Sequence, residues 1–213
     1  MPLIDINITN RYRFANGEEF GDVGQYEVLE GLAKFEIDPL IDINKSIVDL
    51  DLAECQPNGL VLFSSDICIL QPVNHDKGNQ RIFFDVVNRG RKTALSLNDV
   101  PTGTDHFAPL QAGNGFLMRK GYTVVWCGWQ WDVPSNLGLI GLHAPDAIGP
   151  EGPLEGRIMC QFQSDVATQV FLLADRQHTP HPALDINEQE AQLTVRNLPN
   201  QAARSINRNE WSF

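Results

Sequence analysis

Residues 115–134, GFLMRKGYTVVWCGWQWDVP, carry a helix signal, a glycine and a strand signal in close succession. The segment GFLMRK at 115–120 is the best short helix candidate in the chain, and Gly121 follows it in the position favoured for a left-handed helix cap. The next residues, YTVVWC at 122–127, are almost continuously apolar, which is typical of a strand covered on both faces. These residues therefore predict a short helix that turns at glycine into a buried strand.

A second apolar segment precedes this one and supplies another strand. Residues 82–87, IFFDVV, are apolar except for Asp85, and the turn-forming residues NRG follow at 88–90. A strand, a loop, a short helix and a second strand in this order form a βαβ unit, in which the two strands are parallel. The order of these segments therefore predicts an α/β fold over residues 81–134.

The rest of the chain is richer in strand signals than in helix signals. Its apolar segments are short, rich in β-branched and aromatic residues, and bounded by Gly, Pro, Asn or Asp. They predict strands at residues 28–37, 46–55, 59–73 (one long strand or two bent ones), 156–163, 169–175 and 191–195. In the second of these, Asp49 and Asp51 alternate with apolar residues and are expected on the outward face. We expect one β-rich domain over residues 1–213, with a β-rich amino-terminal part at 1–80, the βαβ unit at 81–134 and a loop-rich β insertion at 135–213.

Composition and charge restrict the class of protein. The chain is 42% hydrophobic and 20% charged, as is typical of globular proteins, and its net charge of -11 disfavours binding to nucleic acids and anionic membranes. The sequence shows no signal peptide and no apolar segment long enough to span a membrane. Its four cysteines are far apart and lack metal-site spacing, so reduced thiols are expected. We expect a cytoplasmic protein with no nucleic-acid partner, no membrane partner and no cofactor.

Three tryptophans lie at or just beyond the end of the predicted strand at 122–127, namely Trp126, Trp129 and Trp131. Ligands of open α/β sheets bind outside the carboxyl ends of the strands, so one interpretation makes these side chains the wall of a pocket. Large aromatic side chains at a strand end also fill the core beneath a covering loop, and the sequence favours this packing interpretation. Both interpretations stay open at this point.

Motifs along nearly the whole chain resemble those of one protein family. They are FGDVGQYEVLEGLAKFEIDP at 20–39, IVDLDLA at 47–53, ILQPVNHDKGN at 69–79, VVNRG at 86–90 and GYTVVWCGWQWDV at 121–133. Their order is similar to that in the amino-terminal part of a family of large proteins described as alpha/beta hydrolase domain-containing. The resemblance implies the front half of an α/β-hydrolase-like sheet with additional strands and few helices. It also implies that the serine nucleophile, the triad acid and the triad histidine all come from segments beyond Phe213.

The sequence settings of the serines and histidines also indicate that this chain lacks a catalytic triad. A nucleophile turn needs a serine between glycines on a tight strand-to-helix turn, and no serine of the chain has that setting. The histidines are all in loop-like segments, at His75, His106, His143, His178 and His181. The HTPH motif at 178–181 lacks a third metal ligand nearby. We therefore predict no catalytic residue, no metal site and no esterase turnover for the chain alone.

One part of hydrolase chemistry is expected within this sequence. α/β-Hydrolases form part of the oxyanion hole from backbone N–H groups in the loop after the third strand of the sheet. If residues 82–87 are that strand, the loop consists of Asn88, Arg89 and Gly90, and Gly90 permits close approach to a substrate oxyanion. On this hypothesis Gly90 can be replaced with little loss of folding. A plain turn with a left-handed glycine is the equal alternative.

Two functions from different classes follow. The first is the amino-terminal portion of a serine hydrolase of esterase type, catalytically incomplete as it stands, whose complete form acts on a small-molecule ester or amide. The second is a noncatalytic β-rich binding or structural module. We prefer the hydrolase interpretation. On this interpretation, the strand that would pair with one side of the 82–87 strand is absent from the chain. An edge of this kind, beside exposed Phe83, Phe84, Val86 and Val87, is expected to recruit another copy of the chain or to be covered by residues after Pro134.

Overall fold

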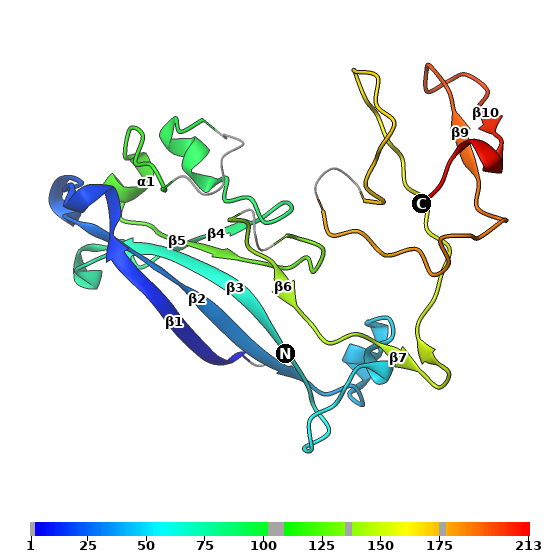
Figure 1. The fold of residues 1–213 in the computed structure, drawn as a ribbon. Helices are drawn as coiled ribbons and strands as arrows, with labels where there is room; N and C mark the ends of the chain where they lie inside the picture. Colours follow the sequence, from blue (N-terminus) through cyan, green and yellow to red (C-terminus); the bar gives the residue numbers. More distant parts are fainter. Residues whose placement is uncertain (1–2, 102–108, 135–137, 175–177) are drawn as a thin grey trace. The chain divides into compact units, whose positions relative to one another are not determined.

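The computed structural model describes residues 3–101, 109–134, 138–174 and 178–213 (Figure 1). Within these residues the chain is strand-rich, with one mixed multi-stranded sheet and very few helices. Two compact units divide the chain. The first is Met1–Leu154 with Gln177–Thr179, and the second is Glu155–Arg176 with Pro180–Phe213. The mixed sheet belongs to the first unit.

The sheet begins with a meander of three long antiparallel strands, β1 (Leu3–Arg13), β2 (Tyr26–Ile37) and β3 (Val61–Pro72). β5 (Thr123–Cys127) adds to the free side of β3 in the antiparallel direction, and β4 (Ile82–Val86) forms the far edge. The strand order is therefore β1-β2-β3-β5-β4 (Figure 1). The predicted strands at 28–37 and 59–73 are confirmed, the latter as a single strand.

The edge pair confirms the parallel strands predicted for the βαβ unit. β4 and β5 run parallel, with Ile82 opposite Thr123 and Val86 opposite Cys127. The helix α1 (Phe116–Arg119) precedes β5, as the sequence predicted. Gly121 caps it with a φ of 74°, and its N–H donates to the carbonyl oxygen of Met118 at 2.9 Å.

The remaining elements of the described chain are short. The 3-10 helices are η1 (Phe14–Gly17), η2 (Gly21–Val23), η3 (Asp42–Ser46), η4 (Leu50–Leu52), η5 (His75–Lys77), η6 (Ala94–Asn98) and η8 (Arg208–Glu210). The short strands are β6 (Leu142–His143), which pairs with β3, β7 (Ile148–Gly149) with β8 (Gly152–Pro153), and β9 (Leu193–Val195) with β10 (Arg204–Ile206). The described part of the second unit therefore contains few regular secondary-structure elements.

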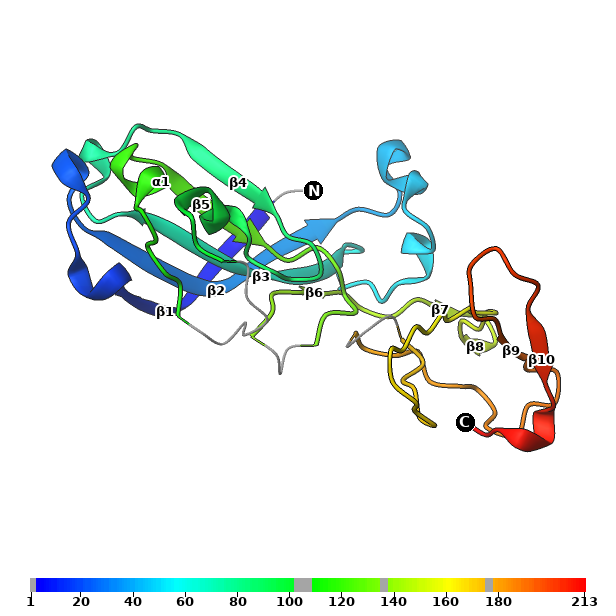
Figure 2. The same ribbon diagram turned by 90° about the horizontal axis from the view of Figure 1, so that it is seen from above.

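The hydrophobic core lies on one face of the sheet. Alternate residues of β2, β3 and β5 point into it, namely Tyr26, Val28, Cys68, Leu70, Val124 and Trp126. Residues from η1, η6 and α1 cover them, and α1 lies over this face beside β5 (Figure 2). The Tyr26 hydroxyl donates to the carbonyl oxygens of Met118 and Tyr122, each at 3.1 Å, and thereby fastens the sheet to the end of α1. Burial raises the pKa of this hydroxyl above its ordinary value.

The opposite face of β4 is apolar and exposed. Ile82, Phe84 and Val86 are 68%, 54% and 67% exposed, respectively. The expectation that Val87 is also exposed is wrong: it is buried in the core, and Phe83 packs partly against that core. The alternation of the strand explains the difference, because successive side chains point to opposite faces.

Three other predictions from the sequence are wrong or incomplete. Residues 46–55 do not form a strand: Asp49 adopts a φ of 56° and η4 follows it. This left-handed conformation, which Asp tolerates better than most residues, interrupts the extended chain that the alternation predicted. Residues 156–163 and the described residues 169–174 contain no strand, whereas the prediction at 191–195 is confirmed in β9. Asp175 lies outside the described residues.

Asp85 connects the parallel pair to the loop that follows it. Its carboxylate accepts hydrogen bonds from the Trp126 indole N–H at 2.7 Å and from the backbone N–H groups of Thr93 and Ala94 at 2.8 and 2.6 Å. A partly buried carboxylate that accepts several N–H groups makes strong, charge-assisted hydrogen bonds. The single charged residue of β4 therefore joins β4, β5 and the start of η6.

We expect Asp85→Ala to lower the free energy of unfolding by about 3 kcal/mol, because it leaves three donors without their shared acceptor. Chemical denaturation followed by tryptophan fluorescence measures the change. The control Asp51→Ala alters an exposed carboxylate and should change stability by less than about 0.5 kcal/mol. Equal effects of the two variants would contradict the connecting role of Asp85.

A buried carboxylate also holds β1 to β2. The guanidinium of Arg11 donates to Glu27 through two nitrogens, at 2.9 and 2.7 Å, and the Gln71 amide donates to the same carboxylate at 3.1 Å. The hydrogen bonds from Arg11 hold the pKa of Glu27 below its ordinary value, although burial opposes them. The side chain of Arg11 is 63% exposed, so solvent screens the pair.

We expect this pair to make stability depend on pH in the acid range. Because the pKa of Glu27 is lower in the folded state, its contribution is present above the unfolded pKa of about 4.3 and is lost as pH falls through the folded value. Glu27→Gln should therefore flatten the acid limb of a plot of unfolding free energy against pH. Glu54→Gln, at an exposed carboxylate, should leave that limb unchanged. Identical limbs for Glu27→Gln and the unmodified chain would contradict the assignment.

Candidate functional site

The carboxyl ends of β4 and β5 meet at one edge of the sheet. The chain leaves β4 through residues 87–92 and leaves β5 through residues 128–134. Ligands of open α/β sheets bind at such edges, because the loops there supply binding groups without disturbing the sheet. This edge is therefore the candidate functional site.

The predicted oxyanion loop is a tight turn anchored to the loop after β5. Arg89 and Gly90 have φ values of 54° and 75°, and the Arg91 N–H donates to the Asn88 carbonyl oxygen at 3.2 Å. The Arg89 N–H donates to the Gln130 side chain at 2.8 Å, and its guanidinium forms an ion pair with Asp132. These contacts fix the position of the 88–91 turn relative to β5.

Gly90 is required by the packing of this turn. A Cβ atom at this position would lie 2.7 Å from the carbonyl oxygen of Ile140 and 2.9 Å from its nitrogen, and the Ile140 N–H donates to the Gly90 carbonyl oxygen at 3.2 Å. The expectation that Gly90 can be replaced with little loss of folding is therefore wrong, because the close approach is to the backbone of Ile140. Within the described residues, the Gly90 N–H has no recorded acceptor. The oxyanion-hole assignment of Asn88, Arg89 and Gly90 stays a prediction.

The three tryptophans beyond the strand have different surroundings. Trp126 is fully buried in the core, where its indole N–H donates to Asp85. Trp129 and Trp131 are 55% and 51% exposed, and the Trp129 indole N–H donates to the Val87 carbonyl oxygen. The packing interpretation therefore describes Trp126. A pocket-wall role stays a prediction for Trp129 and Trp131.

An open pocket of about 530 Å³ adjoins the turn. Its lining includes side chains or backbone from β1, β2, β3 and β6, namely Thr9, Glu30, Gly31, Leu32, Ser64, Asp66, Ile67, Cys68 and His143. The loops at the sheet edge complete it with Lys92, Gly138, Leu139 and Ile140. Ile140 lines the pocket and its N–H donates to the Gly90 carbonyl oxygen, so the pocket lies beside the turn.

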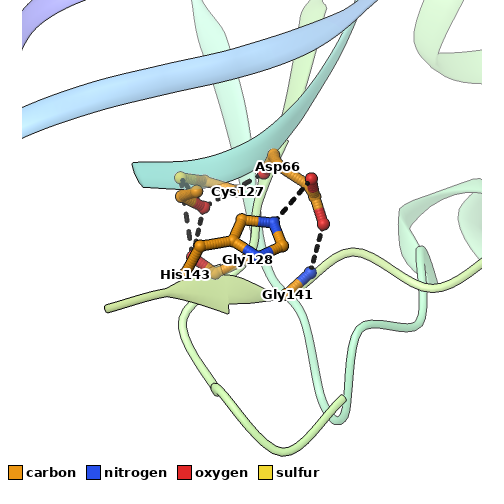
Figure 3. Close-up of polar contacts among 6 residues, drawn as sticks. Asp66, Cys127, Gly128, Gly141 and His143 are labelled. Carbon is orange, nitrogen blue, oxygen red and sulfur yellow. Dashed lines mark hydrogen bonds and ion pairs between the residues drawn. The ribbon is translucent and has the colours of Figure 1, made fainter. Parts of the chain in front are cut away.

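An Asp–His pair fixes the wall of this pocket (Figure 3). One carboxylate oxygen of Asp66 lies 3.0 Å from the Nε2 atom of His143, and the other accepts the Gly141 N–H at 2.8 Å (Figure 3). A Cβ atom on Gly128 would lie 2.2 Å from the Gly141 carbonyl oxygen, so the two glycine backbones approach closely. These contacts hold the 138–143 segment against β3 and the end of β5.

The sequence did not point to this pair. Asp66 and His143 are 77 residues apart, and the sequence places His143 only in a loop-like segment. The pairing of β6 with β3 brings them together, placing His143 opposite Ser64. Neither a motif nor a spacing in the sequence signals a strand of two residues, so no local pattern could have found the pair.

The other nucleophile and ligand candidates are not arranged for catalysis. The Ser65 hydroxyl is buried and donates to the Gly128 carbonyl oxygen at 2.5 Å. Burial raises the pKa of the Cys68 thiol to about 12, so the thiol stays protonated at neutral pH. His178 is buried, His181 is exposed and His106 lies outside the described residues. In the described part of the chain, no group of three or more His, Cys, Asp or Glu side chains is placed to hold a metal ion.

Comparisons with known proteins identify no family for this chain. The chain matches no protein-family model, no curated protein and no solved structure. None of the helices in residues 3–101, 109–134, 138–174 and 178–213 has the length and apolar character needed to cross a membrane.

We expect Gly90→Ala to destabilise the chain by more than about 2 kcal/mol, because the new methyl group adds a backbone clash to the cost of a left-handed conformation. Gly59→Ala is the matched control: Gly59 has a φ of 81° but open space around its Cβ position. The control should cost only about 1 kcal/mol. Thermal and chemical denaturation compare the two variants, and equal losses would contradict the close contact with Ile140.

Proposed function

We propose that this chain is the sheet-forming, amino-terminal portion of an α/β-hydrolase-like serine hydrolase of esterase type, which acts on a small-molecule ester or amide. The observation that carries the proposal is the parallel pair at the end of the sheet. β4 occupies the edge, and the 88–91 turn stands at its carboxyl end beside an open pocket.

The strand directions support this proposal. β3 is antiparallel to its neighbours β2 and β5, and the sheet becomes parallel only at β5 and β4. A nucleophile-bearing strand of an α/β-hydrolase-like sheet would add beside β4. Among the described residues no strand pairs with the outer side of β4, so its backbone groups could pair with such a strand.

The exposed face of β4 gives a second line of support. Parallel strands in α/β proteins are normally covered on both faces, because their crossover helices lie there. Here the core covers one face, whereas Ile82, Phe84 and Val86 remain exposed on the other. A helix that follows an added nucleophile strand would cover these three side chains.

The turn supplies the chemistry expected of this portion. The Gly90 N–H would donate to the oxyanion of an acyl-transfer intermediate, and the contacts of Arg89 with Gln130 and Asp132 would keep it in place. The nucleophile would come from the added strand, because no serine of the chain lies on a Gly-x-Ser-x-Gly turn.

A noncatalytic module is the alternative, and the same edge favours it. A second copy of the chain could pair with β4 and cover the face formed by Ile82, Phe84 and Val86. The two functions differ in what adds to β4: a strand of the same polypeptide for the hydrolase, or another molecule for the module.

The test compares the 213-residue chain with the complete protein encoded by its reading frame, using a serine-directed fluorophosphonate probe. We expect the probe to label a serine in a Gly-x-Ser-x-Gly turn of the complete protein and to leave the chain alone unlabelled. Phe84→Lys in the complete protein should lower the labelling rate at least about tenfold, since a charged side chain cannot be covered by an apolar helix surface.

The control is Val170→Lys, which changes an exposed residue of the second unit and should leave labelling unchanged. A reading frame that ends at Phe213, or stoichiometric labelling of the chain alone, would overturn the hydrolase proposal. Light scattering then tests the alternative: the module requires a dimer that Phe84→Lys dissociates while the variant stays folded.

A further inference from the structure

We propose that the pocket beside the 88–91 turn binds a small zwitterion, namely an amino acid with an apolar side chain. The Glu30 carboxylate holds the ammonium group of the ligand, and the Lys92 ammonium holds its carboxylate. This inference goes beyond the proposed hydrolase function, because it concerns binding by residues of this chain alone and requires no nucleophile.

The pocket lining carries charges of both signs. The carboxylates of Glu30 and Asp66 are negative, and the ammonium of Lys92 is positive. Protonation of His143, the remaining titratable base of the lining, adds a second positive charge. This balance gives no preference to an anion. A ligand that brings one charge of each sign finds an opposite charge for both of its groups.

The two opposite charges reach the pocket from different sides of β3. Glu30 lies on β2 directly opposite Cys68 of β3, whereas Lys92 belongs to the segment that leaves β4, on the other side of β3 in the strand order. Burial is the main cause of the raised pKa of the Cys68 thiol, the Lys92 ammonium opposes the rise, and the Glu30 carboxylate adds to it. Cys68 is therefore within electrostatic reach of both charged groups.

Glu30 and Lys92 do not neutralise each other. Neither forms an ion pair with any residue that the structure describes. The Glu30 carboxylate accepts hydrogen bonds from the Asn10 amide at 3.1 Å and the Tyr12 hydroxyl at 3.3 Å, which orient it without removing its charge. An ammonium and a carboxylate of one ligand would supply the two opposite charges that these side chains lack.

The second carboxylate of the pocket faces a basic group of the protein. One oxygen of Asp66 lies 3.0 Å from Nε2 of His143, and the other accepts the Gly141 N–H at 2.8 Å. These contacts make Asp66 a part of the pocket wall, because they hold β6 against β3. Glu30 is thus the carboxylate of the lining that has no basic partner, and the wall is formed before a ligand binds, which lowers the entropic cost of binding.

The rest of the lining selects the side chain of the ligand. Leu32, Ile67, Leu139 and Ile140 provide apolar surface in the same pocket, which favours an aliphatic or aromatic group. The volume of about 530 Å³ lies within the range of small-molecule sites. An amine without a carboxylate would bring a second positive charge toward Lys92, and a carboxylate without an amine would bring a further negative charge toward Glu30.

The experiment measures binding of L-leucine to the 213-residue chain by isothermal titration calorimetry at neutral pH. The comparison ligands are 3-methylbutylamine, which lacks the carboxylate of leucine, and 4-methylpentanoate, which lacks its ammonium group. We expect leucine to bind at least about tenfold more tightly than either comparison ligand, because each of them loses one charge-assisted hydrogen-bonded contact.

Two variants each remove one charge of the pocket. Lys92→Met keeps the aliphatic stem, Glu30→Gln keeps nearly the same shape, and each should weaken leucine binding at least about tenfold. Lys92→Met should not weaken binding of the amine, and Glu30→Gln should not weaken binding of 4-methylpentanoate, because the charge removed repels that ligand. The matched control is Lys77→Met, which removes an exposed ammonium from η5 and should leave the affinity for leucine unchanged.

Thermal denaturation of each variant establishes that it is folded, and the ligand comparison on the unmodified chain decides the matter if a variant does not fold. Absence of leucine binding, equal or tighter binding of either comparison ligand, or unchanged leucine affinity in either folded pocket variant would each overturn the inference. None of these results bears on fluorophosphonate labelling of the complete protein, so failure of this inference and failure of the hydrolase proposal can be told apart.

Discussion

The carboxylate of Asp85 is the contact on which the candidate site depends. It accepts hydrogen bonds from an indole of β5 and from two backbone N–H groups at the start of η6, so one acidic side chain sets the path of the chain after β4. The 88–91 turn and Lys92 lie on that path, between Asp85 and Thr93. This acceptor holds the chain beyond the turn, in addition to the contacts of Arg89 with Gln130 and Asp132. A charge within an apolar strand is therefore explained by the loop that it organises.

The sequence predicted the parts of the fold that depend on local chemistry. The glycine cap after α1, the continuous apolar segments of β4 and β5 and the Pro-terminated β3 each leave a local pattern, and each lies where expected. The prediction for residues 46–55 was wrong, because Asp49 adopts a left-handed conformation that interrupts the extended chain, and the alternation does not reveal it. β1 was not predicted: its exposed residues mix Ile with Asn and Asp, and its position is set by pairing with β2.

Only part of the candidate site could be predicted in the same way. The NRG turn carries its own signature, since a left-handed pair that ends in glycine suits such a turn. The interior of the pocket has no signature, because Lys92, Asp66 and His143 come from three distant segments. Gly128 shows the limit most clearly: a Cβ atom there would lie 2.2 Å from the Gly141 carbonyl oxygen, and the sequence around Gly128 does not reveal this neighbour.

The strand order indicates how the sheet assembles from its strands. β1, β2 and β3 follow one another along the chain, whereas β4 contacts the sheet only through β5, and Asp85 meets Trp126 across 41 residues. Loop closure of this length costs conformational entropy that a hairpin avoids, so we expect the meander to form before β5 and β4 add to it. Because β4 pairs with β5 alone, we expect its amide groups to exchange faster than those of β2 and β3, which pair on both sides. The loop that carries the candidate chemistry thus follows an edge strand, and its own contacts with Gln130, Asp132 and Ile140 hold it in place.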